Sequence, residues 1–528
     1  MRKQVRFGRI AMPVDCVLIL AISLLAQMTA FSAKQGRAVI CGDSVQYYNS
    51  AEALIVGDRL AHFDMRKPGY GLFLAGVGLA FGNMGWAAVT CNHVLLALLP
   101  LAAYGLGRHL HSRLLGWVAA CFVLAQLQTV VWGTRMMSDP LFACLLSFGL
   151  LLFVVGLSKI RTLPWMASAG LLFGLACLTR GTGAPLVVAA TIFLVATMWQ
   201  CRRRLVVTLV SFVTPVAVLF LFECSLNLIL SGGFRPADGT AGATVALRAR
   251  HFDGMDIPNT GASRWALALL PERTREAAYL CNHIDVWIAR HRAIRDRGMT
   301  EWEYDGLMAR FGWDMIAAEP FKYASSAAKT TLWHLLRREH GKDLSAVPDA
   351  RRAATLLHPA ARSRHEGERY WYAYWGMPHL SLADSIELVD RMRAEAAQRA
   401  PFGESRFFAA MRYYAAKPIV VATLNAARWL GSLWPGLAIL ACGILGIRRR
   451  TCFLLAALYV ADAVLIGALT PTTPRLQFVW LVPDTTLAAA LVVTVPAVLL
   501  SRCRTWLRPQ SDIAGQQLGS APQQSWPA

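Results

Sequence analysis

The sequence predicts an all-α, multi-pass membrane protein: a bundle of about ten transmembrane helices with a mainly helical domain inserted on the outer side, between spans 7 and 8. Of the 528 residues, 55% are hydrophobic and only 16% are charged, whereas soluble proteins carry about 25% charged residues. Long apolar runs recur along the chain, and a spanning helix needs roughly 20 mostly apolar residues. Lys and Arg gather in alternate short loops between these runs, the pattern that marks cytoplasmic loops.

The first apolar run covers residues 14–33 and follows a basic segment with Arg2, Lys3, Arg6 and Arg9. The run is long and no small-residue cleavage site ends it. We therefore expect a retained first helix with a cytoplasmic N-terminus rather than a signal peptide. Residues 34–70 follow as a polar outer loop, and residues 71–81 as a short apolar piece in the membrane interface.

Nine further spans are expected at 85–106, 114–132, 140–157, 165–178, 184–199, 205–230, 429–447, 452–469 and 478–500. One set of loops carries clustered cations: Arg108 and Arg113, Lys159 and Arg161, the Arg triplets 202–204 and 448–450, and Arg502, Arg504 and Arg508. The opposite short loops carry single cations, Arg135, Arg180 and Arg475. This alternation places both termini in the cytoplasm.

The chain divides into four predicted parts. Residues 1–230 form an N-terminal transmembrane half that includes the first outer loop, and 417–500 hold the last spans. Residues 231–416 are too polar to span, and helical stretches at 290–310 and 382–399 indicate a folded outer domain. The tail, 501–528, is rich in Gln, Pro and Ser and is expected to be a disordered cytoplasmic segment.

The twelve cysteines are scattered, and no pair has the spacing of a zinc site. The sequence therefore predicts no cysteine-bound metal centre. Cys41 and Cys281 both fall on the expected outer side, where a disulfide between them remains open.

Acidic residues are rare outside the inserted domain, although the net charge of the chain is +21. Those outside 231–416 are Asp15, Asp43, Glu52, Asp58, Asp64, Asp139, Glu223, Asp462, Asp484 and Asp512. A carboxylate is costly to bury in so apolar a background, so these residues are candidates for function. Asp43 and Asp139 adjoin apolar segments on the same expected side of the membrane.

Both residues have a structural interpretation as well. Ser138-Asp139-Pro140 is a helix-start signature, with an Asp cap followed by Pro in the first turn. The sequence around Asp43, Gly-Asp-Ser, is typical of an ordinary turn. The nearby Tyr47 and Tyr48 also fit interface anchors.

Taken together, two carboxylates, a Tyr pair and the basic Arg66-Lys67 at a bilayer surface indicate a site for a phosphate-linked substrate. Three stretches carry it: Gly42-Asp43-Ser44-x-x-Tyr47-Tyr48, Arg66-Lys67-Pro68-Gly69-Tyr70, and Ser138-Asp139-Pro140-Leu141-Phe142. This combination resembles the GT-C glycosyltransferases. The likeness is greatest to the bacterial lipid A aminoarabinose transferases, the protein mannosyltransferases and the rhizobial lipopolysaccharide glycosyltransferase group.

A fourth stretch, Thr473-Pro474-Arg475-Leu476-Gln477-Phe478, is similar to the Arg-Tyr-x-x-Pro element of that family. The chain departs from the family in three places. Leu476 or Gln477 replaces the Tyr, Ser44 replaces a common Glu, and Gly69 replaces the second Pro of a Lys-Pro-Pro element. The likeness covers 14–180 well and the last span thinly. It does not extend to 231–416, so the acceptor is not inferred from it.

The resemblance implies transfer of a sugar from a polyprenyl-phosphate donor to an envelope acceptor, by inverting displacement. The acceptor is a glycolipid, glycan or protein on the periplasmic side of a bacterial inner membrane. No cofactor is expected, and since two Asp alone are a thin oxygen shell, a divalent cation stays unassigned.

Residue roles follow from the resemblance. Asp43 is the expected base and Asp139 the residue that positions its neighbours, because an acceptor hydroxyl or amine needs a carboxylate to share its proton. Cations suit the departing phosphate, and these are Arg66, Lys67 and Arg475. The expected substrate-binding residues are Ser44, Tyr47, Tyr48 and Tyr70.

Two alternatives remain open. A secondary transporter or flippase would use Glu223, Asp462 and Asp484 as intramembrane ionisable groups. Such proteins often show repeated halves, which this sequence lacks, and the inserted domain would be unusual in one. A polymerase or ligase that joins whole lipid-linked glycans differs in its donor but not in topology. We rank the transferase above the transporter.

Overall fold

The computed structural model describes residues 8–33, 36–40, 42–56, 66–126, 132–159, 162–231, 233–236, 241–252, 254–270, 283–336, 382–398 and 400. Four predicted elements lie outside them: the three C-terminal spans, the tail at 501–528, the Cys41/Cys281 pair, and Arg475 with Asp462 and Asp484. Within the described residues the chain is almost entirely helical, with one isolated β-bridge between Val39 and Arg135. The predicted all-α class is confirmed there.

Four of the described helices are long and apolar enough to cross a membrane. They are α1 (Gly8–Ala33), α4 (Met84–Leu110), α7 (Asp139–Ser158) and α10 (Arg202–Ser231). Four more are apolar but shorter: α3 (Pro68–Phe81), α5 (Arg113–Leu124), α8 (Leu163–Thr179) and α9 (Gly183–Met198). Their bounds follow the predicted spans closely except at α5, whose helix stops well before residue 132. The total of about ten spans stays a prediction.

Local capping sets several of these bounds. Asn83 accepts a hydrogen bond from the Trp86 backbone N–H at 3.0 Å and starts α4. The Ser112 hydroxyl accepts from the Leu115 N–H at 3.2 Å and starts α5. Such caps satisfy N–H groups that have no partner inside the helix. At the far end of α3, Gly82 takes a left-handed conformation with φ of 70°, which ends the helix without strain.

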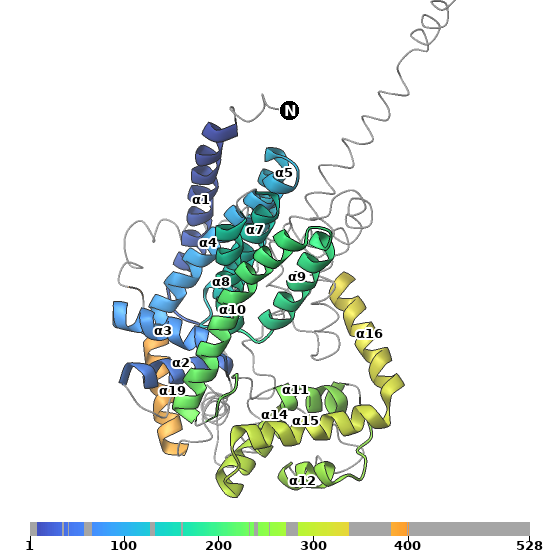
Figure 1. The fold of residues 1–528 in the computed structure, drawn as a ribbon. Coiled ribbons are helices and arrows are strands. Elements are labelled where there is room, and N and C mark those ends of the chain that lie inside the picture. The colour runs from blue at the N-terminus through green and yellow to red at the C-terminus, as the bar shows by residue number, and fades with distance from the viewer. Residues whose placement is uncertain are drawn as a thin grey trace, which may run out of the picture.

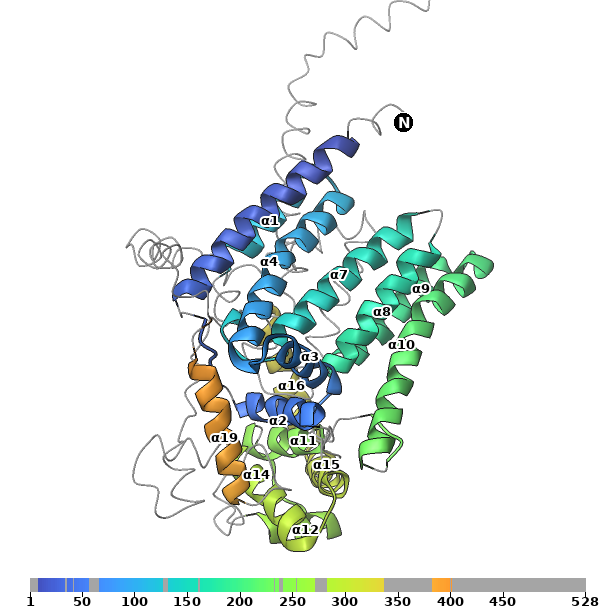
Figure 2. The ribbon, with the colours of Figure 1, turned by 90° about the vertical axis from the view of Figure 1, so that its left-hand side faces the viewer.

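The apolar helices form one bundle, in which α8 packs between α7 and α10 while α4 contacts α1, α5 and α7 (Figure 1, Figure 2). Phe212 of α10 meets Phe153 and Phe173 edge-on, with ring centroids 5.2 and 5.4 Å apart. A Cβ on Gly170 would lie 2.0 Å from the Phe212 carbonyl oxygen, so α8 and α10 approach each other backbone to backbone. Small residues permit such close packing between membrane helices.

The segment between the first two predicted spans differs from its prediction. Residues 34–70 were expected to form a loop, but Gly42–Val56 is a helix, α2, and Asp43 lies in its first turn. Residues 43–48, 50 and 51 of α2 are all buried, and the helix contacts both α3 and α19. Gly-Asp-Ser thus begins a helix that its neighbours enclose, rather than forming a turn.

A helix from the predicted outer domain covers the same segment. α19 (Leu382–Ala397) matches the expected helix at 382–399 and packs on α2 and α4 (Figure 2). Its Leu388, Val389 and Met392 share a buried cluster with residues of α2. The Tyr48 hydroxyl donates to Glu395 Oε1 at 2.8 Å. Part of the 231–416 region therefore lies directly against the helix that carries Asp43.

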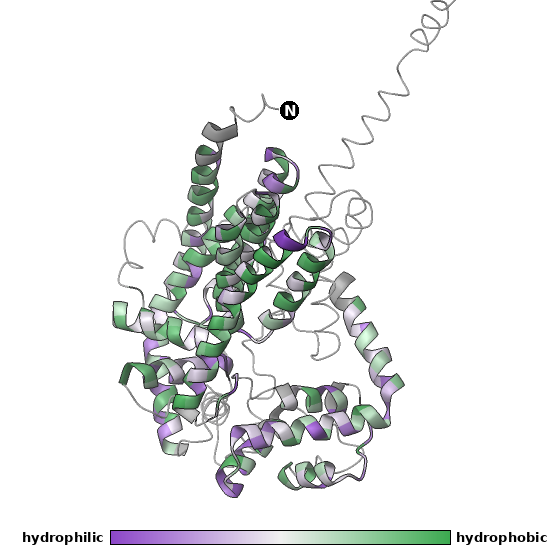
Figure 3. Ribbon diagram, viewed as in Figure 1, coloured by the Kyte–Doolittle hydropathy of each residue, from purple (hydrophilic) through white to green (hydrophobic). Residues whose placement is uncertain are grey.

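The remaining described helices form a second cluster with more polar surfaces (Figure 3). They are α11 (Ala241–Leu247), η1 (Arg248–Phe252), α12 (Gly261–Leu269), α14 (His283–His291), η2 (Arg292–Asp296), α15 (Glu301–Ala318) and α16 (Pro320–Leu336). Buried side chains of α15, including Met308 and Phe311, form the centre of this cluster.

The single helix expected at 290–310 is wrong. The chain leaves helical geometry at Gly298, whose φ is 64°, and α15 starts afresh after Thr300. Thr300 and Glu303 form a reciprocal capping box, a strong helix-start signal. Arg290 and Glu301 then form a buried ion pair across the break. The Thr-x-x-Glu signal was present in the sequence and outweighs the continuous polar pattern.

Candidate functional site

Asp43 lies in the first turn of α2, where its side chain is mostly buried. Arg66 Nη2 donates to Asp43 Oδ1 at 2.5 Å, and Arg66 Nε donates to Gln46 Oε1, also at 2.5 Å. Residues three apart share a helix face, so α2 presents both acceptors to one guanidinium. The Arg66 guanidinium also lies 5.9 Å from the centre of the Tyr47 ring. The predicted base and a predicted phosphate ligand are therefore direct partners.

The second motif lies against the first. The Tyr47 hydroxyl and Ser138 Oγ are 2.9 Å apart, and the Ser44 hydroxyl donates to the Met136 carbonyl at 2.9 Å. Backbone hydrogen bonds around Val39 join the chain before α2 to the chain before α7. The stretches 42–48 and 137–142, about ninety residues apart in sequence, are thus neighbours in space.

Asp139 is the first residue of α7 and is fully buried. Ser138, not Asp139, holds the cap position, and its side chain makes no capping hydrogen bond, so the expected Asp cap is wrong. Arg180 Nη1 donates a hydrogen bond to Asp139 Oδ1. Arg180 is the residue that ends α8, and its guanidinium lies 5.8 Å from the Phe142 ring centre. Asp139 therefore forms a buried ion pair across α7 and α8.

Lys67 points to a different helix from its neighbour Arg66. Lys67 Nζ lies 2.8 Å from Glu223 Oε1 of α10. Their side chains are 12% and 2% exposed, respectively. A Cβ on Gly69 would lie 2.8 Å from the Leu178 backbone, so the start of α3 packs on the last turn of α8, beside Arg180. The three ion pairs are thereby brought to the same end of the bundle.

The four predicted substrate-binding side chains are buried. Tyr47 and Tyr70 contact each other edge-on, with ring centroids 4.8 Å apart. Burial, together with the Glu395 carboxylate that accepts its hydrogen bond, raises the pKa of Tyr48. Among the described residues the Tyr70 hydroxyl has no hydrogen-bond partner within normal geometry, which is uncommon for a buried donor. In this arrangement Ser44, Tyr47 and Tyr48 fix α2 in place.

Two residues of this cluster were not predicted as site residues. Arg180 stood out in the sequence only as a lone cation on an outer loop, and Glu223 as a rare acid in an apolar run that the alternative transporter would use. Their rarity was the available signal, but it did not identify their partners. Arg475 lies outside the described residues, so its convergence with Asp43 and Asp139 stays a prediction.

The family comparison covers most of this cluster. Residues 66–229 match the model of the dolichyl-phosphate-mannose-protein mannosyltransferases. The matched segment contains Arg66, Lys67, Asp139, Arg180 and Glu223, while Asp43 lies before it. No protein with a curated function matches the chain significantly.

Solved structures give distant likenesses. One is an oligosaccharyltransferase from Archaeoglobus fulgidus in complex with Zn and sulfate, which is 12% identical to this chain with a TM-score of 0.42. The alignment covers 96% of this chain and 54% of the archaeal one. ArnT from Cupriavidus metallidurans bound to undecaprenyl phosphate is 16% identical with a TM-score of 0.33, and covers 96% of this chain and 81% of its own.

The chain thus spans about half the length of the archaeal enzyme. Both TM-scores are below 0.5. The family match includes the motifs at Arg66 and Asp139, from which the resemblance was inferred. The predicted resemblance to the GT-C glycosyltransferases is confirmed over residues 66–229.

Proposed function

We propose that the protein is an integral-membrane glycosyltransferase. It moves a sugar from a polyprenyl-phosphate donor to a cell-envelope acceptor, on the periplasmic side of a bacterial inner membrane. The supporting observation is the grouping of three ion pairs, Asp43–Arg66, Lys67–Glu223 and Asp139–Arg180, at one end of an apolar bundle. Five of these six residues fall in the matched mannosyltransferase segment. The family is named for a dolichyl-phosphate-mannose donor, and a lipid-phosphate sugar is the donor class proposed here.

Asp43 acts as the base in this proposal. The acceptor hydroxyl or amine attacks the anomeric carbon, its proton passes to the Asp43 carboxylate, and the bond from that carbon to the phosphate oxygen breaks. The polyprenyl phosphate leaves with the bonding electrons. One displacement with inversion needs a single base, unlike the paired carboxylates of retaining hydrolases. General-base help of this kind contributes roughly 10²- to 10⁴-fold.

Arg66, Lys67 and Arg475 are the proposed ligands of the donor phosphate. Arg66 and Lys67 each contact an acidic side chain, so a phosphate binds them by sharing or replacing that carboxylate. A guanidinium contacts phosphate through two parallel N–H groups. Arg66 is therefore ranked above Lys67 as a donor ligand. Its movement toward phosphate would also release the Asp43 carboxylate to accept the proton.

Asp139 acts indirectly. It holds Arg180 at the end of α8, while the adjacent Ser138 contacts Tyr47 of α2. The pair therefore positions the helix that carries Asp43 relative to α7 and α8. Ser44, Tyr47, Tyr48 and Tyr70 line the packed side of the site and limit how the sugar can lie.

The lipid part of the donor is proposed to lie along α10. This helix exposes Phe220, Leu221 and Phe222 next to buried Glu223, so an apolar chain can pack there while its phosphate reaches Lys67. The region 231–416 is proposed to select the acceptor. One part of it, α19, already packs on α2.

Mass spectrometry of envelope glycolipids and glycans tests the proposal. Cells with and without the chain should differ by one missing sugar on one product, and purified protein should consume a polyprenyl-phosphate sugar. Unchanged envelope glycans together with uptake or efflux lost on Asp462→Asn would instead support the transporter. Transfer of whole glycans in the same assay would indicate the ligase.

A further inference from the structure

A basic pocket lies at the other end of the bundle from the three ion pairs. It has a volume of about 790 Å³ and opens between the start of α8 and the turn from α9 to α10. Its lining residues are Thr162, Leu163, Pro164, Cys201, Arg202, Arg203, Arg204 and Val207. Glu223 follows Arg202 by 21 positions on α10, which corresponds to about 30 Å along a helix. The pocket and the proposed active site are therefore separated by about the thickness of a bilayer core.

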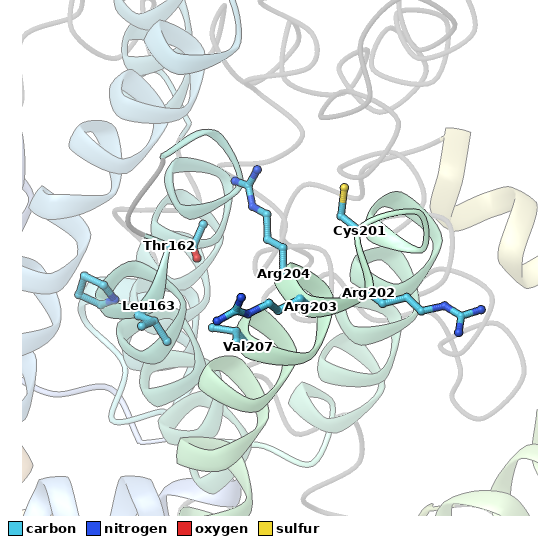
Figure 4. A pocket seen from close by; sticks show the side chains of 8 residues that line it. Thr162, Leu163, Cys201, Arg202, Arg203, Arg204 and Val207 are labelled. Atoms are coloured by element: carbon cyan, nitrogen blue, oxygen red, sulfur yellow. The ribbon is translucent and has the colours of Figure 1, made fainter.

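Among the described residues that line the pocket, the charged ones are all arginines. Figure 4 shows Arg203 and Arg204 extending into the space between the two helices, whereas Arg202 turns away from it. Arg204 Nη2 donates to the Lys159 carbonyl at 3.2 Å, which holds this side chain over the end of α7. The positive ends of two helices, α8 and α10, lie at the same place.

The walls of the pocket are apolar. Leu163 and Val207 are 52% and 41% exposed, and Pro164 adjoins Leu163. Trp165 and Trp199 are exposed at the same end of the bundle, and Trp concentrates at membrane–water interfaces. A ligand there meets guanidinium groups on one side and hydrocarbon on the other.

We propose that this pocket binds the phosphate headgroup of an anionic phospholipid from the membrane leaflet on that side. The phosphate contacts Arg203 and Arg204, and an acyl chain continues past Val207 along the exposed apolar face of α10. Basic pockets between membrane helices bind anionic headgroups in this way. A soluble phosphate would gain nothing from the apolar walls, so the lipid is the ligand that fits both sides. The site is independent of the proposed transfer reaction.

Native mass spectrometry of the full chain in detergent tests this site, with phosphatidylglycerol added and phosphatidylcholine as the neutral comparison. We expect phosphatidylglycerol to be retained and phosphatidylcholine not. Each cation near a membrane surface contributes an affinity factor of about five. The double variant Arg203→Gln/Arg204→Gln should therefore lose about 25-fold in phosphatidylglycerol affinity. Arg202→Gln removes an adjacent charge whose side chain turns away from the space, so it should lose less phosphatidylglycerol affinity than Arg203→Gln or Arg204→Gln alone.

A second variant tests the pocket independently if the double variant misfolds. Leu163→Asp, at an exposed position, introduces a carboxylate into the pocket without removing an arginine and should also weaken binding. The thermal unfolding midpoint in lipid-free detergent reports whether each variant folds. An equal loss in Arg202→Gln would overturn the proposal in favour of diffuse surface charge. Equal retention of phosphatidylcholine, or displacement of phosphatidylglycerol by inorganic phosphate at the same concentration, would overturn it as well.

Discussion

Lys67 at the start of α3 and Glu223 of α10 form an ion pair with 2.8 Å between Nζ and Oε1, across 156 residues of sequence. Both side chains are largely shielded from solvent. When one member of a buried pair is removed, the other remains as an uncompensated charge, which costs more than replacing both members by apolar groups. Comparing the loss of Lys67 alone with the loss of both residues therefore distinguishes a structural contribution of Lys67 from a catalytic one.

We expect Lys67→Met to destabilise the protein by roughly 3–5 kcal/mol, because Glu223 is left buried without its partner. The double variant Lys67→Met/Glu223→Leu should recover most of that stability. Its rate of sugar transfer should nevertheless stay as low as that of Lys67→Met, since the Lys67 ammonium no longer contacts the donor phosphate. Unfolding in detergent and a transfer assay on the same samples check both points. An active double variant would show that Lys67 only balances Glu223.

Asp43→Asn should lower the rate of sugar transfer by about 10²- to 10⁴-fold while leaving expression and membrane insertion near normal. The amide keeps the shape of the side chain and can still face Arg66, but it cannot accept a proton. Glu52→Gln is the matched control, because Glu52 lies on the same helix and pairs with Arg391 instead. Full activity in Asp43→Asn would remove Asp43 from the mechanism.

Asp139→Asn distinguishes a helix cap from a charged partner. Asn caps helices as well as Asp does, so a capping role alone predicts no change. Because Asp139 accepts a hydrogen bond from Arg180, we expect Asp139→Asn and Arg180→Gln each to reduce transfer. The double variant should transfer sugar no more slowly than the slower of the two single variants, since the two residues act as one unit. Additive losses in this cycle would mean that they act separately.

Arg475→Ala should raise the KM for the lipid-linked donor more than the KM for the acceptor. The resemblance assigns Arg475 to the donor phosphate, although it lies outside the described residues. Steady-state kinetics with each substrate varied in turn measure the two effects. A defect confined to the acceptor would place Arg475 elsewhere in the mechanism.

The contact between α2 and α19 should weaken as pH rises. Burial, and then the carboxylates of Glu395 and Glu387, raise the pKa of Glu52 above its ordinary value of 4.5, although Arg391 lowers it in part. An acid whose pKa is raised in the folded state stabilises that state below the ordinary value, and this contribution is lost as pH rises through the raised pKa. Hydrogen exchange of α19 amides, corrected for intrinsic rates, should show less protection at pH 7 than at pH 5. In Glu52→Gln this difference should shrink; an unchanged pH dependence would exclude Glu52 as its source.

The basic and acidic motifs were visible in the sequence because rare charges stand out in an apolar chain. Asp43 and Asp139 stood out in this way, whereas Arg66 stood out by its place in the Arg66-Lys67-Pro68-Gly69-Tyr70 motif. The structure makes direct neighbours of Asp43 and Arg66. The sequence treated Arg66 and Lys67 as one basic patch. In the structure Arg66 pairs with Asp43 of α2, whereas Lys67, directly before α3, pairs with Glu223 of α10.

By itself, the sequence determined most of the apolar helices among the described residues, because hydropathy acts over a few residues, but it missed α2, which is held by its contacts with α3 and α19. Only the tertiary structure decided that Glu223 pairs with Lys67, that Arg180 pairs with Asp139, and that α19 packs on α2. These relationships depend on how each helix is rotated and shifted against its neighbours. That geometry results from the packing of the whole bundle, to which residues far apart in sequence contribute together.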